Sequence, residues 1–167
     1  MAEQKWITEA RKLLGTREIR GPKHNPTVVQ MFADAGFSGI KDDETAWCAA
    51  FVGATLKRAG VKPSGSLLAL SYAPGKWGVT LKSPVVGCLA TKRRPGTSWS
   101  GHVFFVVDYD AQYVWGLGGN QSDMVNVVKY PRAALVGYTW PKEAPIPTNS
   151  KEGAFRSASA AAPGREA

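Results

Sequence analysis

The feature that most constrains the fold is a change of hydrophobic period along the chain. Before about residue 85 the apolar residues recur at helical spacing, and after it they alternate as in strands. A chain with its helices first and its strands second lacks the alternating units from which parallel sheets are built. This order predicts an α+β domain in which N-terminal helices pack on an antiparallel sheet.

The first half of the chain carries the helical signals. Asn25 followed by Pro26 is typical of an N-cap with proline in the first helical position. The third segment is apolar over most of its surface, which indicates a buried central helix. Helices are predicted over residues 6–14, 26–36 and 46–60, with a short one over 66–72.

The second half carries the strand signals. Strands are predicted over residues 85–90, 102–109, 113–118, 125–129 and 135–140. A turn at Asp110-Ala111 would make residue numbers paired across that hairpin sum to about 221. After residue 140 the chain is rich in Pro, Ala, Ser and Gly. We therefore expect one domain over 1–140 and a disordered tail over 141–167.

Charge and composition narrow the class of protein. The 21 Lys and Arg against 13 Asp and Glu give a formal net charge of +8, which favours an anionic partner such as nucleic acid, anionic lipid or an acidic wall polymer. The one tight basic run, residues 92–94, is expected to be a solvated loop. The N-terminal stretch is not apolar, and no apolar run is long enough to cross a membrane. We therefore expect a protein that is made in the cytoplasm and has neither a signal peptide nor a membrane anchor.

Cys48 is the candidate nucleophile. We expect it about one turn into the central helix, where the positive end of the helix dipole lowers the pKa of a thiol. The acidic residues at 42–44 oppose this effect, so the thiol also needs an imidazole. The alternative is a buried structural cysteine, because free cysteines are often buried. Cys88, in a predicted strand, is expected to be buried and inert.

His102 is the candidate base, because it opens a predicted strand in which an apolar residue would pack equally well. A structural histidine at a strand end is the alternative. The expected hairpin register places residue 119 or 120 opposite it, and the Asn120 side chain can accept from the imidazole N–H. A slip of one residue would substitute Gln121, and a Gly-Gly-Asn turn without a catalytic role is also open. Asp108 is disfavoured because it lies at the far end of the same strand.

Together these residues resemble NlpC-type cysteine peptidases, the papain-like peptidoglycan hydrolases of bacteria and phages that are related to the CHAP amidases. The resemblance is carried by residues 43–52, 101–103 and 118–123, and it extends from about residue 6 to residue 140. It implies a papain-like fold, with the cysteine on a helix and the histidine on the sheet that follows. Residues 84–88 depart from the Pro-Gly-Asp that relatives often carry before the histidine strand.

The resemblance implies a hydrolase that cleaves an amide bond of the peptidoglycan stem peptide with Cys48, His102 and Asn120. The expected partner is bacterial peptidoglycan, with phage-particle proteins as further candidates and no nucleic acid. The expected place of action is the cell wall, reached by phage release or from the virion. His24 and His102 lie far apart and no Cys/His cluster exists, which predicts no metal and no cofactor.

Two other functions stay open at this point. A papain-like acyltransferase or isopeptidase would use the same thiol on another substrate, although an acyltransferase would want a membrane anchor. A non-catalytic basic module could bind glycan or nucleic acid through the six tryptophans, although no basic-aromatic stripe is visible. Whether an amidase or an endopeptidase bond is cut, the host and the oligomeric state are not readable from the sequence.

Overall fold

The computed structural model describes residues 3–19, 25–37, 47–96 and 100–147, and every structural statement below concerns these residues. The helices are α1 (Lys5–Arg11), α2 (Pro26–Asp34), α3 (Cys48–Arg58) and the 3-10 helices η1 (Ala69–Tyr72) and η2 (Arg132–Ala134). The strands are β1 (Val79–Leu81), β2 (Leu89–Arg93), β3 (Gly101–Tyr109), β4 (Tyr113–Gly118), β5 (Asn126–Pro131) and β6 (Leu135–Trp140). The predicted α+β class is confirmed.

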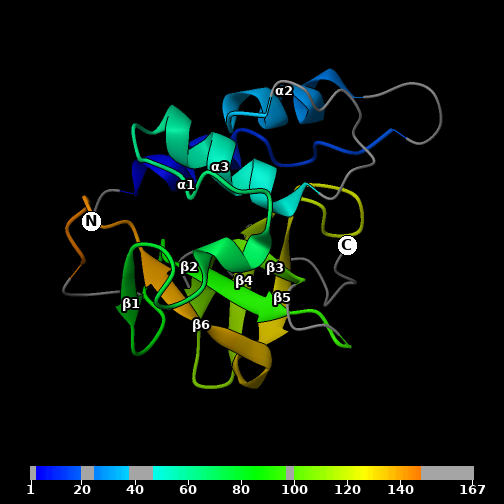
Figure 1. The fold of residues 1–167 in the computed structure, drawn as a ribbon. Helices are drawn as coiled ribbons and strands as arrows, with labels where there is room; N and C mark the ends of the chain where they lie inside the picture. Colours follow the sequence, from blue (N-terminus) through cyan, green and yellow to red (C-terminus); the bar gives the residue numbers. More distant parts are fainter. Residues whose placement is uncertain (1–2, 20–24, 38–46, 97–99, 148–167) are drawn as a thin grey trace.

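The strands form one six-stranded antiparallel sheet in the order β1-β6-β2-β3-β4-β5. The three α-helices lie together on one side of this sheet, and α3 contacts both β3 and β4 (Figure 1). The short helix η1 packs on β2 and β3. The central strand β3 therefore faces the helix that carries Cys48.

The core lies between α3 and β3. Every residue of α3 from Cys48 to Leu56 is buried, as is every residue of β3 except Tyr109. Phe51 and Phe105 meet edge to face across this interface, with ring centroids 6.0 Å apart. The prediction of a buried central helix is confirmed, and its burial fixes the position of the thiol relative to the sheet.

Several boundaries agree with the sequence, and the start of β2 differs for an identifiable reason. The Asn25 side chain accepts from the Thr27 N–H at 2.8 Å, which confirms the predicted N-cap of α2. The second strand begins four residues later than expected, because the Cys88 N–H donates to the Val85 carbonyl and Gly87 adopts φ +98° in a turn. Lys92, expected in a solvated loop, is therefore a strand residue. Strand β1 was not predicted at all.

The hairpin between β3 and β4 has a different register from the one expected. Phe105 pairs with Leu117 and Tyr109 with Val114, so the paired numbers sum to 222 and then 223 instead of 221. Asp110 explains the shift at the turn, because its carboxylate accepts from the Gln112 and Tyr113 N–H groups at 2.9 and 2.7 Å. A bulge between Val106 and Asp108 changes the register once more.

Strand β6 ends at Trp140, where the predicted domain ends. Most of the predicted tail, residues 148–167, lies outside the described part of the chain. Residues 141–147 are described, and the Trp140 indole N–H donates to the Ala144 carbonyl at 3.0 Å. Ala144 also packs against the core, so the first residues after β6 remain in contact with the domain. No helix in the described segments is long and apolar enough to span a membrane.

The sheet predicts a large effect of a small substitution at Gly116. A Cβ atom there would lie less than 3.0 Å from three atoms of the Phe104 ring, which is buried and cannot retreat. We expect Gly116→Ala to lower the free energy of unfolding by about 1–3 kcal/mol, as overpacked cores do. Gly53→Ala on α3 is the matched control, because its Cβ would come no nearer than 3.1 Å to any neighbouring atom, the Ala35 Cβ, and alanine favours helix. Urea denaturation of both variants measures the difference, and equal stabilities would contradict the packing described.

Candidate active site

Cys48 is the first residue of α3, with Trp47 as the N-cap, and 6% of its surface is exposed. The expectation that it lies one turn inside the helix was wrong. Trp47 has non-helical dihedrals, and its carbonyl accepts the first helical bond, from the Phe51 N–H at 2.9 Å. The predicted start near residue 45 lies outside the described residues. At the first helical position the thiol sits closer to the unpaired N–H groups and the positive end of the dipole than expected.

The electrostatic environment of Cys48 favours the thiolate. Burial raises the pKa of the thiol, but the neighbouring His102 imidazole lowers it, as a polar partner and through its charge. The backbone N–H groups of Val103 and Ala49 also lower it. The pKa of Cys48 therefore lies below its usual range, in spite of the cost of burial.

Cys88 provides the contrast within the same chain. It is fully buried, has no disulfide partner, and immediately precedes β2. Burial raises the pKa of its thiol to about 12. A thiol of this kind stays protonated at neutral pH and is a poor nucleophile. Its environment is that of the inert residue expected from the sequence.

His102, the second residue of β3, is fully buried and bonds to Gln121. Its Nε2 lies 3.0 Å from Gln121 Oε1. The orientation of the Gln121 amide follows from the acceptors around it. Its Nε2 donates to the Gly116 carbonyl at 3.2 Å and to both the carbonyl and the side-chain oxygen of Asn126 at 2.9 Å. Because backbone carbonyls only accept, the nitrogen must face them and Oε1 must face His102.

This orientation determines the tautomer of His102. Gln121 Oε1 can only accept, so the proton of the neutral ring must sit on Nε2. The lone pair is then on Nδ1, the ring nitrogen that remains for the Cys48 thiol. A base in this state can take the thiol proton and later return it to a leaving amine.

The structure does not bring Asn120 to His102. Strand β4 ends at Gly118, so the alternation that placed residue 120 beside the imidazole does not continue that far. Asn120 instead adopts a left-handed conformation with φ 60°, and its buried Oδ1 accepts no hydrogen bond in the described part of the chain. The backbone reversal brings in Gln121, the alternative for a shifted register. Asp108, disfavoured from the sequence, accepts from the Tyr109 N–H at the other end of β3.

Three residues of the site carried no clear sequence signal. Tyr130 on β5 donates its hydroxyl to Gln121 Oε1 at 2.9 Å, and Asn126 holds the other end of the same amide. Gly118 is required because the Gln121 side chain lies close against its backbone, and a Cβ there would lie 2.6 Å from Gln121 Oε1. The inward alternation of β5 could have placed Tyr130 in the core, but not against a particular residue.

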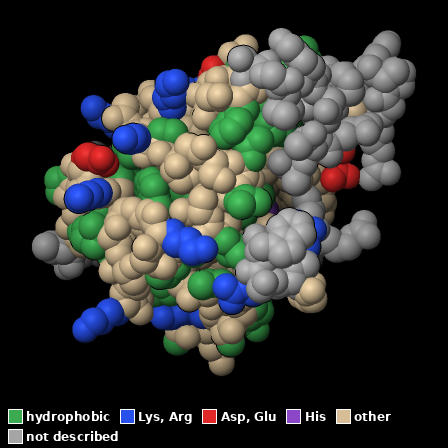
Figure 2. All heavy atoms as spheres, in the orientation of Figure 1, with side chains coloured by type: hydrophobic (Ala, Val, Ile, Leu, Met, Phe, Trp, Pro, Cys, Tyr) green, Lys and Arg blue, Asp and Glu red, His purple; other side chains and the backbone are tan. Residues whose placement is uncertain are grey.

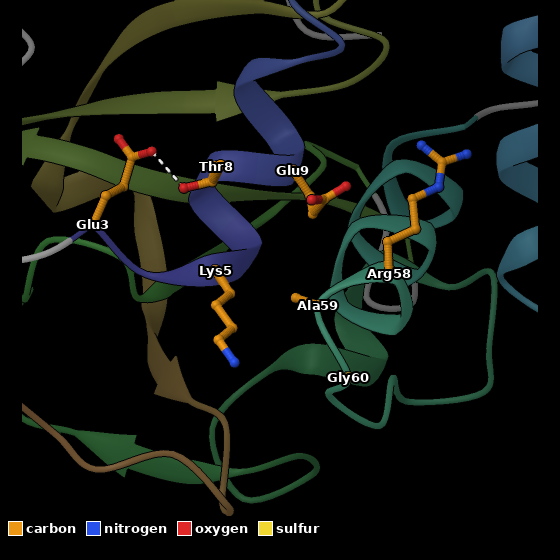
Figure 3. Close-up of a pocket in the computed structure, with 7 residues that line it drawn as sticks. All are labelled: Glu3, Lys5, Thr8, Glu9, Arg58, Ala59 and Gly60. Atoms are coloured by element: carbon orange, nitrogen blue, oxygen red, sulfur yellow. Dashed lines mark hydrogen bonds between the residues drawn. The ribbon is translucent and has the colours of Figure 1, made fainter.

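A cavity of about 420 Å³ lies elsewhere, between α1 and the C-terminal end of α3 (Figure 3). Arg58 in its wall is ten residues from Cys48, or about 15 Å along a helix. Three of its four charged side chains form ion pairs: Glu3 with Arg11, Glu9 with Lys12, and Arg58 with Asp34. This cavity is therefore not part of the Cys48 site.

The face shown in Figure 2 carries no continuous basic patch. On the face shown in Figure 2, Lys and Arg side chains are scattered among apolar and polar groups and form no continuous stripe. In the described segments no group of three or more His, Cys, Asp or Glu residues could hold a metal ion. The arrangement that can do chemistry is the buried row of Cys48, His102 and Gln121.

Comparisons with protein-family models, with curated proteins and with solved structures found no match. The chemistry assigned to this site therefore rests on its geometry and on the residues themselves.

The two thiols should differ sharply in reactivity. At pH 7 iodoacetamide should modify Cys48 in the native protein and leave Cys88 unmodified, because only Cys48 has its pKa lowered. Labelling of Cys48 should persist well below pH 8.5, where an ordinary thiol is protonated. Mass spectrometry of the digested protein measures both sites, and protein unfolded in urea, where both thiols should react, is the control. Faster labelling of Cys88 in the native state would refute the assignment.

The third position can be tested with a pair of neighbouring variants. Gln121→Ala should slow alkylation of Cys48 at neutral pH about tenfold, because the ring loses the bond that fixes its tautomer. Asn120→Gly removes a side chain without straining the positive φ, and should leave the rate nearly unchanged. The reverse result would restore Asn120 to the role expected from the sequence.

Proposed function

We propose that this chain is a cysteine hydrolase that cleaves an amide bond in the stem peptide of bacterial peptidoglycan. One observation carries the proposal: His102 Nε2 is bonded to Gln121 Oε1 at 3.0 Å, which leaves Nδ1 as the ring nitrogen for the Cys48 thiol, whose pKa His102 lowers. A structural cysteine and a structural histidine need neither a lowered thiol pKa nor a fixed tautomer. Nucleophilic catalysis needs both.

The proposed reaction has two halves. In the first, the Cys48 sulfur attacks the carbonyl carbon of the substrate, and the negative charge that develops on the carbonyl oxygen lies near the backbone N–H of Cys48 at the start of α3. The His102 imidazolium gives its Nδ1 proton to the amine as the C–N bond breaks, which leaves a thioester. In the second, Nδ1 takes a proton from water, the hydroxide attacks the thioester, and the sulfur departs as thiolate.

The substrate class rests on different support from the chemistry. The residues that carry the resemblance to NlpC-type peptidases include all three members of the site, at 43–52, 101–103 and 118–123. The net charge of +8 suits an anionic wall polymer. The proposed place of action is therefore the cell wall, and no step of the proposed reaction uses a metal or cofactor.

Digestion of purified peptidoglycan tests this function. The full chain should release soluble fragments, and Cys48→Ala should release none, because the nucleophile and its base act as a unit. Cys88→Ala is the matched control, since it removes an equally buried thiol with no role in the reaction and should digest normally. Mass spectrometry of the fragments would identify the bond: free stem peptides indicate an amidase, and shortened stems an endopeptidase. Equal activity of the Cys48→Ala and unmodified proteins would contradict the proposal.

A further inference from the structure

Gln121 Oε1 accepts two hydrogen bonds, and only one of them comes from the candidate base. The second donor is the hydroxyl of Tyr130, at 2.9 Å, against 3.0 Å for His102 Nε2. Tyr130 is 3% exposed and stacks on Phe104, with ring centroids 4.5 Å apart and an interplanar angle of 14°. Its hydroxyl is therefore held in place by packing, and it competes with the imidazole for one oxygen.

The other end of the Gln121 amide is equally constrained. Its NH₂ group faces three acceptors, two of them on Asn126 and one on the Gly116 backbone. The Asn126 side-chain nitrogen also donates back to the Gln121 carbonyl at 3.2 Å. A flipped amide would turn its oxygen toward these acceptors and its NH₂ toward two donors. It would also force the His102 proton onto Nδ1, where the ring could not serve as a base for the thiol.

We propose that Asn126 and Tyr130 are positioning residues that act on His102 through Gln121, an inference that rests on the proposed function of Cys48 and His102. The Asn126 side chain adds an acceptor and a donor to the two backbone carbonyls that hold the amide, and so strengthens the orientation that puts the His102 proton on Nε2. The Tyr130 hydroxyl donates a hydrogen bond to the same oxygen, and so limits how strongly Gln121 stabilises the imidazolium. Together they set both the tautomer of the base and the pH at which it loses its second proton.

The direction of the Tyr130 effect follows from the sharing of one acceptor. Two donors to one oxygen weaken each other, and the charged imidazolium gains most when its neutral competitor is removed. The described titratable groups that face His102 are the Cys48 thiol on α3, the Tyr130 phenol on β5 and Lys92, its register partner on β2. Tyr130→Phe alters none of their charges at neutral pH and keeps the stacked ring. A change in His102 titration would then report the lost hydroxyl.

Nitrogen-15 NMR of histidine-labelled full chain tests the proposal without a substrate. Only His24 and His102 contribute signals, and His24→Gln assigns them. The unmodified chain should show His102 with its proton on Nε2. Tyr130→Phe should keep that tautomer and raise the pH at which the imidazolium deprotonates by about 0.3–1 unit, the range expected for one neutral hydrogen bond. The alkaline limb of peptidoglycan digestion should move in the same direction.

Tyr72→Phe is the matched control, because it also removes a buried tyrosine hydroxyl, one that contacts Ser64 and not Gln121. It should leave the titration of His102 unchanged. Asn126→Ala removes one of the three acceptors of the Gln121 NH₂ and leaves the two backbone carbonyls, so it should raise the population of the form with the proton on Nδ1 and slow Cys48 alkylation. Asn126→Asp, which keeps the side-chain acceptor, should restore the Nε2 form.

Each failure has a separate meaning. An unshifted titration in Tyr130→Phe, or an unchanged tautomer in Asn126→Ala, would overturn the positioning roles while leaving a reactive Cys48 in place. A Nδ1 proton on His102 in the unmodified chain would overturn the base assignment, and with it the proposed function. If Tyr130→Phe and Tyr72→Phe shift the titration equally, the effect is a general loss of packing and the proposal is also refuted.

Discussion

The hydrogen bonds around the Gln121 amide are the constraint on which the site depends. A buried amide with an unpaired N–H or C=O would cost about 1–3 kcal/mol, so the surroundings must supply acceptors on one side and donors on the other. Backbone carbonyls and Asn126 provide the acceptors, and Tyr130 and His102 provide the donors. The state of the histidine is thus a consequence of satisfying a neighbouring polar group in the core.

The packing of the sheet makes this arrangement sterically possible. Gly118 leaves room for the Gln121 oxygen, and Gly116 leaves room for Phe104, on which Tyr130 stacks. Side chains at either glycine would push apart the groups that hold the imidazole. The helix contributes from the other side, because burial of α3 against β3 brings its first residue to the sheet beside His102. The contacts that stabilise the core also hold the imidazole, so a substitution that weakens them would affect both the stability of the fold and the state of His102.

The sequence identified two of the three members of the site by chemical reasoning and the third only as an alternative. Cys48 and His102 stand out because a thiol at a helix start and an imidazole in an apolar strand are unusual residue types for those positions. Asn120 was preferred over Gln121 through a count of residues across a hairpin. That count assumed a turn at residues 110–111 and a regular ladder. The Asp110 turn and the bulge changed the register, and the end of β4 at Gly118 stopped the ladder before it reached residue 120.

By itself the sequence determined the α+β class, the order of the predicted helices and strands and the cap of α2, and it selected the candidate thiol and imidazole. These follow from local chemistry: hydrophobic period, capping side chains and residue type act within a few positions of the chain. Only the tertiary structure decided that α3 begins at Cys48, that Gln121 and not Asn120 meets His102, and that Tyr130 shares the same oxygen. The bonds to Gln121 join residues that lie on β3 and β5 and in the segment after β4. Their alignment depends on register, bulges and close glycine contacts, which no short stretch of sequence encodes.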